Sequence, residues 1–290
     1  MPTSIPADHA RGILLMLVAM LLFTLNDAIG KWLVATYPVG QLLAIRSFAA
    51  LVVLVPLAWR NGDLKRLFSL ARPGLQLVRI LLVITEVGCF YWAVKFLPLA
   101  DVFMFYLASP LFLTALSVII LGQHVGIRRW VALLVGFAGV IFIFPPSDAV
   151  LSLPALIALT GSLALALMLT LARTLSASGG LTLITLQTLG VGLAGAATVP
   201  FAWVTPDFVD LSLLCLLGLV ATTGHFLMNS AVTTAPSAVV APFQYTSIVW
   251  AIILGYLIWG DFPAPQALAG AALIVGSGLF VLYRENITKA

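Results

Sequence analysis

The feature that most constrains this chain is a series of long apolar segments that no charged residue interrupts. Examples are Ile13–Leu25, Leu51–Trp59, Leu111–Leu121 and Val131–Phe144. A soluble protein covers its surface with polar side chains, yet 62% of these 290 residues are apolar and only 8% are charged. The segments are continuous rather than alternating in polarity, which favours lipid-embedded helices over the strands of a barrel. The sequence therefore predicts an all-α integral membrane protein.

Gly, Pro and charged residues divide the apolar sequence into ten predicted transmembrane helices. The predicted spans are 12–35, 41–59, 75–95, 99–121, 129–145, 151–173, 181–204, 211–233, 237–259 and 266–283. At about 20 apolar residues per span, ten spans leave no room for an extramembrane domain. This excludes a soluble catalytic module, a nucleotide-hydrolysing domain and a nucleic-acid binder. The first span is too long for a cleaved signal peptide, so we expect it to be retained.

The lysines and arginines predict how the helices are oriented. With ten spans the short tails, residues 1–11 and 284–290, share one side, and ten of the fourteen basic residues fall on that side. They are Arg11, Arg60, Lys65, Arg66, Arg72, Arg128, Arg129, Arg173, Arg284 and Lys289. Because short basic loops stay on the cytoplasmic side of a membrane, we expect both termini in the cytoplasm.

The two halves of the chain resemble each other. When Ala93–Gly122 is aligned with Ala231–Gly260, ten of the thirty positions are identical, including the proline that opens each span and the glycine that closes it. We therefore expect two repeats of five helices, residues 12–145 and 151–283. An odd number of spans inverts the second repeat in the membrane, an arrangement that supports alternating access with the substrate bound between the halves.

Several segments carry a resemblance to a known family. They are PVGQLLAIR from Pro38, LPLADVFMFYLASP from Leu97, Gly122 with WVALLVGFAGV from Trp130, TAPSAVVAPFQ from Thr234 and GAALIVGSG from Gly270. In this order they resemble the EamA-type transporters of the drug/metabolite transporter superfamily, and within it the bacterial exporters of aromatic amino acids. The resemblance implies a monomeric carrier of the bacterial inner membrane, with an amino acid as its small-molecule substrate and no cofactor.

Charged side chains inside the spans need a reason, because a charge at the centre of a bilayer costs about 2.5 to 3.5 kcal/mol on insertion scales. Asp27 and Lys31 stand four residues apart in the first span and can form a structural pair along one helix face. Glu86 lies deeper, with Arg46 and Arg79 in the neighbouring spans. It is either a proton carrier or one half of a structural clamp with an arginine, and we expect the clamp.

A second set of candidates is polar or aromatic and would bind substrate. The set is Asn26, Phe90, Tyr91, Tyr106, His225, Asn229, Gln244 and Tyr245. Aromatic side chains suit a flat or apolar group, while the amides and the histidine suit amino and carboxylate groups. The alternatives are ordinary aromatic packing and a buried neutral histidine. Pro110 and Pro242 interrupt the fourth and ninth spans and are candidates for gate hinges.

Other functional signals are weak. GVGLAG at Gly190–Gly195 matches a dinucleotide-binding pattern, but it lies inside an apolar span, where small residues let helices pack closely. The three histidines are too scattered for a metal site, and no catalytic motif is present. An amino-acid exporter is thus the leading hypothesis. Export of another metabolite or drug, such as a nucleobase or a lipid-like compound, is the alternative, and an intramembrane enzyme or a channel is disfavoured.

Overall fold

The computed structural model describes residues 7–63, 72–121, 127–143, 152–175 and 179–289, and these residues are helical almost throughout. The α-helices are α1 (Ala7–Val34), α2 (Val39–Arg60), α4 (Pro73–Val94), α5 (Leu99–Tyr106), α6 (Ser109–Leu121), α7 (Ile127–Ile143), α8 (Leu153–Thr174), α9 (Gly180–Thr198), α10 (Phe208–Thr234), α11 (Ser237–Val240), α12 (Thr246–Trp259) and α13 (Pro265–Lys289). Two short 3-10 helices, η2 (Val199–Phe201) and η3 (Ala241–Tyr245), complete the described elements.

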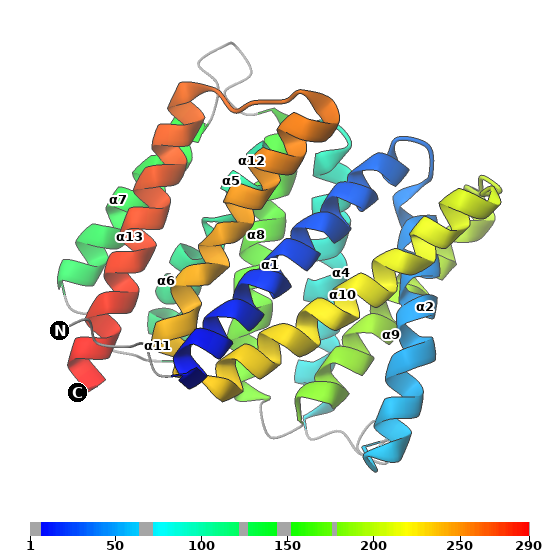
Figure 1. Cartoon of the computed structure of the whole chain (residues 1–290), viewed down its shortest axis with the longest axis horizontal. Coiled ribbons are helices and arrows are strands. Elements are labelled where there is room, and N and C mark those ends of the chain that lie inside the picture. The colour runs from blue at the N-terminus through cyan, green and yellow to red at the C-terminus, as the bar shows by residue number, and fades with distance from the viewer. Residues whose placement is uncertain (1–6, 64–71, 122–126, 144–151, 176–178, 290) are drawn as a thin grey trace.

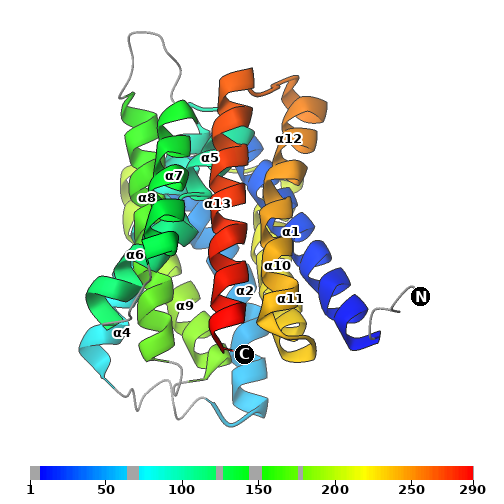
Figure 2. The same ribbon diagram turned by 90° about the vertical axis from the view of Figure 1, so that its left-hand side faces the viewer.

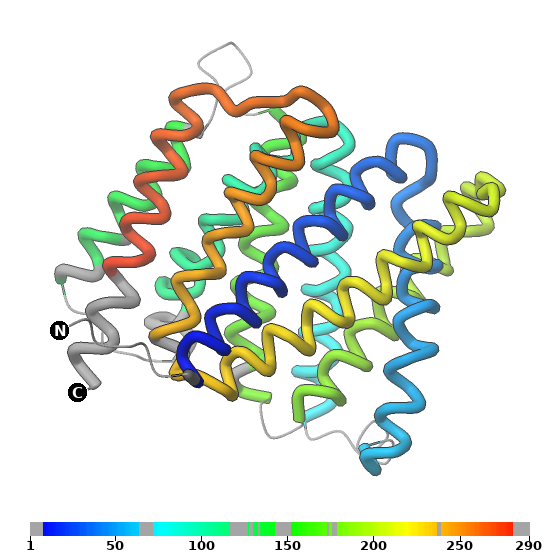
Figure 3. Tube along the Cα trace, in the orientation of Figure 1, coloured from blue at the N-terminus to red at the C-terminus, as the bar shows by residue number. Residues whose placement is uncertain are grey.

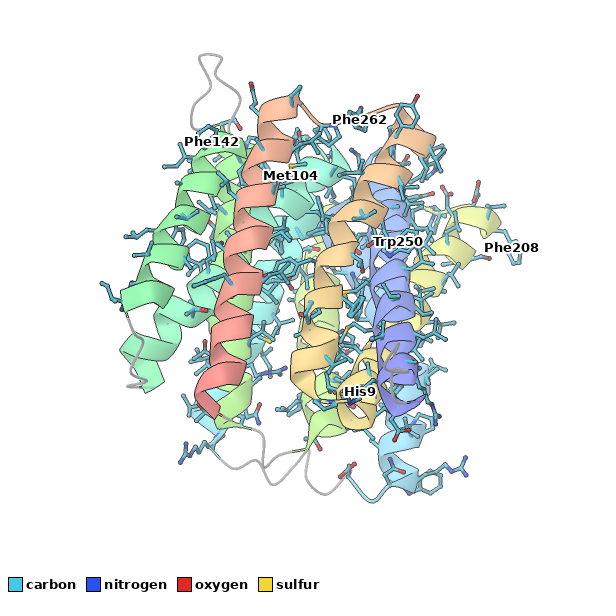
Figure 4. The ribbon with its side chains drawn as sticks, turned by 60° about the vertical axis from the view of Figure 1, so that its left-hand side comes forward. His9, Met104, Phe142, Phe208, Trp250 and Phe262 are labelled. Atoms are coloured by element: carbon cyan, nitrogen blue, oxygen red, sulfur yellow. The ribbon has the colours of Figure 1, made fainter. Side chains whose placement is uncertain are left out.

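Within the described residues, eight helices are long and apolar enough to cross a membrane. The fifth and tenth predicted spans correspond to shorter apolar helices, Trp130–Phe142 and Pro265–Phe280. Large apolar side chains cover the outside of the bundle, and Phe142, Phe208 and Phe262 stand at its periphery in Figure 4. Water does not favour so much exposed apolar surface, whereas lipid does. The predicted all-α, multi-pass membrane fold is confirmed.

The helices pair across the two halves of the chain. α1 packs on α10, α2 on α9, α4 on α8, and α7 on α13, and α5 contacts α12. Figures 1 and 3 show α1 beside α10 and α7 beside α13. In the order of the spans, the first helix pairs with the eighth and the third with the sixth. Because the first and sixth spans occupy equivalent positions in the two halves, as do the third and eighth, the two contacts are equivalent. This pattern is that of a two-repeat transporter fold.

The bundle has two distinguishable ends. α1 begins and α13 finishes at the same end, which we call the termini end (Figures 1 and 2). The opposite end, which we call the far end, carries the connections from α1 to α2, from α4 to α5 and from α12 to α13. The chain therefore crosses the bundle an even number of times, as ten spans require.

Two of the predicted spans are broken by a change of helix. The fourth span divides into α5 and α6, and Pro110 lies in the first turn of α6, where the missing backbone N–H is tolerated. The ninth span divides into α11, η3 and α12, with Pro242 in the 3-10 turn. Both prolines thus lie at a discontinuity within the bundle rather than in an unbroken helix.

The glycines of the dinucleotide-like pattern lie at a helix contact. A Cβ atom at Gly195 would lie 2.5 Å from the carbonyl oxygen of Gly40, and one at Gly192 would lie 2.9 Å from Cβ of Ser47. Both neighbours belong to α2, so small residues allow α9 to approach it closely. The interpretation of this pattern as helix packing is confirmed.

Candidate functional site

A polar cluster joins α1, α2 and α4 among the apolar helices. Nη1 of Arg46 donates a hydrogen bond to the Tyr91 hydroxyl at 2.8 Å, and the guanidinium lies 5.4 Å from the centroid of the Tyr91 ring. Nδ2 of Asn26 donates to the same hydroxyl at 3.1 Å and to Oδ1 of Asp27 at 3.0 Å. Asn26 and Tyr91 are buried, while Asp27 and Arg46 are half-buried. One hydroxyl group therefore links three helices.

Two glycines allow the helices to approach this cluster. A Cβ atom at Gly30 of α1 would collide with the Tyr91 ring, and one at Gly218 of α10 would collide with the carbonyl oxygen of Arg46. Larger residues at these positions would separate α1 from α4 and α10 from α2. The small residues thus set the distances at which Tyr91 and Arg46 face the centre of the bundle.

The carboxylates of Asp27 and Glu86 lie near Arg46. Glu86 interacts electrostatically with both Asp27 and Arg46, and Asp27 interacts with Arg46 and with the Tyr91 hydroxyl. Glu86 is half-buried, and its carboxylate forms no ion pair or hydrogen bond with any residue that the structure describes. We use the name polar cluster for Asn26, Asp27, Arg46, Glu86 and Tyr91 together.

The expected pair between Asp27 and Lys31 is wrong. Nζ of Lys31 lies 3.6 Å from Oδ2 of Asp261, donates to the carbonyl oxygen of Leu97 at 3.0 Å, and lies 4.8 Å from the centroid of the Trp259 ring. The long lysine side chain extends to the far end of the bundle, where polar partners are available. Asp27, with a short side chain, stays beside Asn26. We call the Lys31–Asp261 ion pair, with its contacts to Leu97 and Trp259, the far-end latch.

The expected clamp between Glu86 and an arginine is also wrong. Nη2 of Arg79 donates to Oε1 of Gln187 at 2.8 Å, and Nη1 donates to the carbonyl oxygen of Leu183 at 3.3 Å. Arg79 therefore ties α4 to α9, two helical turns away from Glu86 along α4. The guanidinium of Arg46 donates its hydrogen bond to the Tyr91 hydroxyl rather than to Glu86. Spacing along α4 placed Arg79 near Glu86, but the approach of α9 determined its partner.

Three aromatic candidates come together beside the polar cluster. The Phe90 ring packs edge-on against Tyr91, with ring centroids 5.5 Å apart, and against Tyr106, with centroids 5.3 Å apart. The Tyr106 hydroxyl donates to the backbone carbonyl of Glu86 at 3.0 Å. Tyr245 does not join this group, because its hydroxyl end lies against Gly278 of α13.

The candidates of α10 and η3 lie apart from this aromatic group, since His225 contacts α1 and the two amides lie further towards the termini end. The imidazole of His225 packs edge-on against Phe23, with centroids 4.9 Å apart, and interacts electrostatically with Arg46. Asn229 and Gln244 are exposed and lie towards the termini end, away from Tyr91. The polar face expected for α10 is thus divided, since Thr222 is buried and bonds its own helix at Gly218 while Asn229 is exposed.

Several residues that the sequence did not single out hold the far end together. Besides Trp259 and Asp261 of the far-end latch, the Tyr37 hydroxyl donates to Oδ2 of Asp210 at 2.7 Å. Gln41 forms two hydrogen bonds with the backbone of Val204, at 2.6 and 2.9 Å. Topology is the one signal that could have suggested these contacts, because it places all of these residues at the same end.

The described residues contain no group of three or more His, Cys, Asp or Glu that could hold a metal ion. Two apolar hollows lie on the outside of the bundle. One, of about 490 Å³, is lined by Ile252, Ile253, Tyr256, Leu257 and Phe262, and the other, of about 410 Å³, lies between α7 and α13. Neither involves the polar cluster, and both face the region that lipid would occupy.

Comparison with known proteins identifies the family. The EamA-like transporter family model matches residues 10–144 and, a second time, residues 152–283. The chain belongs to this family. The two matches adjoin near residue 150, so each half of this EamA-family protein carries one copy of the family sequence. Membership makes the chain a membrane transporter of small molecules and not an enzyme.

Curated relatives carry several kinds of substrate. The chain is 23% identical over 279 residues to an S-adenosylmethionine uptake transporter of Rickettsia prowazekii, which covers 96% of this chain and 94% of the relative. It is 28% identical over 273 residues to the pseudopaline exporter CntI of Pseudomonas aeruginosa, with 91% and 93% coverage. It is 25% identical over 290 residues to a riboflavin transporter of Rhizobium johnstonii, with 98% and 95% coverage. These names support transport, but they leave the resemblance to exporters of aromatic amino acids unsupported.

A solved crystal structure shares the fold of this EamA-family protein. The TM-score is 0.67 over 96% of this chain and 99% of that chain, at 15% sequence identity. At this identity the likeness concerns the fold alone.

Proposed function

We propose that this protein is a secondary transporter that exports amino acids and related metabolites across the inner membrane of a bacterium. In this proposal both termini lie in the cytoplasm, one chain suffices for transport, and the inverted repeats, residues 12–145 and 151–283, expose a central site alternately to the two sides. The termini end is then cytoplasmic and the far end is external.

The observation that carries the proposal is the position of Arg46. Its guanidinium lies within the apolar bundle, and no carboxylate among the described residues lies within ion-pairing distance of it. A guanidinium binds a carboxylate through two parallel hydrogen bonds, so Arg46 can receive the carboxylate of an amino acid. Phe90 and Tyr91 of α4 and Tyr106 of α5 lie close together and offer aromatic surface to an apolar side chain.

The remaining candidates belong to a path between this site and the cytoplasm. His225 interacts electrostatically with Arg46 and can contact the substrate, while Asn229, Gln244 and Tyr245 line the path towards the termini end. One relative supports the substrate class, since S-adenosylmethionine is built on the amino acid methionine. Direction is not implied by the relatives, because that relative is an uptake transporter and another is an exporter.

The alternative is a transporter of another flat metabolite. The aromatic group around Phe90 and the riboflavin transporters among the relatives favour it. In that case Arg46 would bind a polar substituent of a ring system, and amino acids would not be exchanged.

Counterflow in proteoliposomes distinguishes these proposals. The purified protein is tested with labelled phenylalanine, tryptophan, threonine, S-adenosylmethionine, riboflavin and a nucleobase. Saturable exchange of amino acids supports the proposal, whereas exchange of riboflavin or the nucleobase without amino acids overturns it in favour of the alternative. Arg46→Gln should abolish exchange, and Arg60→Gln, at the exposed end of the same helix, should retain it.

A further inference from the structure

The polar cluster holds more carboxylates than cations. Asp27 and Glu86 interact electrostatically with one another, and both interact with the guanidinium of Arg46. The other arginine inside the bundle, Arg79 of α4, is occupied by Gln187 and Leu183 of α9. From α10 His225 interacts electrostatically with Arg46, and from α5 Tyr106 interacts with Glu86 and Asp27. None of these groups gives either carboxylate an ion pair within the described part of the chain.

Arg46 cannot fully serve both carboxylates. Its closest contacts are the hydroxyl and the ring of Tyr91, at 2.8 Å and 5.4 Å. Two carboxylates in a low-dielectric region repel each other unless a positive charge or a proton lies between them. The cluster therefore needs a proton or a further positive charge between the two carboxylates.

An independent observation lies beside Asp27. Asn26 is only 3% exposed, and its Nδ2 donates to Asp27 and to Tyr91, yet its Oδ1 has no hydrogen-bond partner. Buried amide oxygens nearly always accept a hydrogen bond, so Oδ1 of Asn26 is an unsatisfied acceptor that a bound ligand could satisfy. An acceptor next to a carboxylate suits a group with several N–H donors and a positive charge, which is what an alkylammonium group provides.

We propose that Asp27, Glu86 and Oδ1 of Asn26 form the subsite for a cationic nitrogen of the transported molecule. This inference rests on the proposed function and makes it more specific. The ammonium group lies among the two carboxylates and the amide oxygen, and the carboxylate of the same molecule lies at Arg46. The rings of Tyr91 and Tyr106 border the subsite and attract a cation through their faces. The transporter thus requires a positively charged nitrogen rather than a carboxylate alone.

Three small molecules separate the two charges in an experiment. Phenylalanine carries both an ammonium and a carboxylate, 2-phenylethylamine carries only the cation, and 3-phenylpropionate carries only the anion. Each is tested as a counterflow substrate and as a stabiliser of the detergent-solubilised protein against thermal unfolding. The wild type should exchange phenylalanine and be stabilised by 2-phenylethylamine, and 3-phenylpropionate should compete at least about tenfold less well than phenylalanine.

The variants Asp27→Asn and Glu86→Gln keep the shapes of the side chains and remove the charges. Each should weaken the apparent affinity for phenylalanine and for 2-phenylethylamine by about tenfold or more, and leave that for 3-phenylpropionate unchanged or improved. Asp8→Asn, at the exposed start of the same helix as Asp27, is the matched control and should behave as the wild type. Thermal unfolding without ligand shows whether each variant is folded.

The outcomes distinguish this subsite from the wider proposal. If phenylalanine is exchanged and the two variants retain its affinity, or if 3-phenylpropionate competes equally well, the cation subsite is overturned and the amino-acid transporter stands. If the amine is exchanged and depends on both carboxylates but no amino acid is exchanged, the subsite stands and the amino-acid assignment is overturned. If neither phenylalanine nor 2-phenylethylamine is exchanged or stabilises the protein, both the cation subsite and the amino-acid transporter are overturned.

Discussion

The same repeated segment is packed at one end of the molecule and loose at the other. At the far end, where α4 meets α5, Val94 and Val102 are completely buried. The equivalent segment at the termini end joins α10 to α11. There the counterpart of Val94, Val232, is 38% exposed, and Phe243 is half-buried where its counterpart Phe105 is buried, although Val240, the counterpart of Val102, is buried as well. The helix after the shared proline also differs, since α5 has eight residues whereas α11 has four and continues as a 3-10 turn.

The side chains explain much of this difference. Tyr91 and Tyr106 of the packed segment correspond to Asn229 and Gln244 of the loose one, so aromatic side chains at one end are replaced by amides at the other. Aromatic rings fill space between helices, while exposed amides keep contact with water. The far-end latch adds an ion pair at the packed end. We therefore expect the far end to be closed and substrate to enter from the termini end.

The largest expected effect comes from truncating the matched pair Tyr91 and Asn229. Tyr91→Ala removes a side chain that is only 1% exposed and breaks its hydrogen bonds with Arg46 and Asn26, so it should destabilise the protein by about 3–5 kcal/mol. Asn229→Ala, at an exposed position, should cost less than about 0.5 kcal/mol. Thermal unfolding in detergent measures both. Equal losses would show that the two ends are packed alike.

A second test compares the accessibility of the two equivalent valines. In a background without Cys89 and Cys215, Val94→Cys should react much more slowly with a water-soluble thiol reagent than Val232→Cys, because Val94 is fully buried. Labelling rates by mass spectrometry measure the difference. A substrate that shifts the protein to a state open at the far end should reduce the difference between the two labelling rates. Similar rates before substrate is added would contradict the closed far end.

The third test opens the far-end latch. Lys31→Met removes the partner of Asp261 and the cation over Trp259, and it should increase the labelling rate of Val94→Cys several-fold. Because the pair is partly exposed, its contribution to the stability should be small, about 1 kcal/mol or less. Asp261→Asn should act in the same direction, and the double variant should add little to either change. Additive effects would show that the two side chains act separately.

Hydropathy and the internal repeat predicted the fold because a helix in lipid satisfies its own backbone and reveals its length as an apolar run. The sequence suggested Asn26 and Tyr91 as substrate-binding candidates and Arg46 as a coupling or structural charge, but it did not indicate that these three side chains contact one another. The partners of the charged residues could not be predicted. Lys31 reaches Asp261, and Arg79 reaches Gln187, through contacts between helices that are distant in the sequence. The spacing of residues along one helix does not show how the neighbouring helices are aligned against it, so it does not predict which side chains meet between helices.

The smallest expected effect concerns a hydrogen bond that adds to the closure of the far end. The Tyr37 hydroxyl donates to Asp210, and this bond raises the pKa of Tyr37 from 10.0 to about 12. The unfolded chain then loses the tyrosine proton at a lower pH than the folded protein does. The bond therefore contributes stability in full below pH 10.0, and the contribution disappears as the pH rises to about 12.

Thermal unfolding of the wild type and of Tyr37→Phe tests this bond. The two unfolding temperatures should differ near neutral pH and converge between pH 10.0 and about 12, since other groups titrate alike in both proteins. A constant difference would mean that Asp210 does not hold the hydroxyl proton, and the far end would then depend on the latch and on aromatic packing.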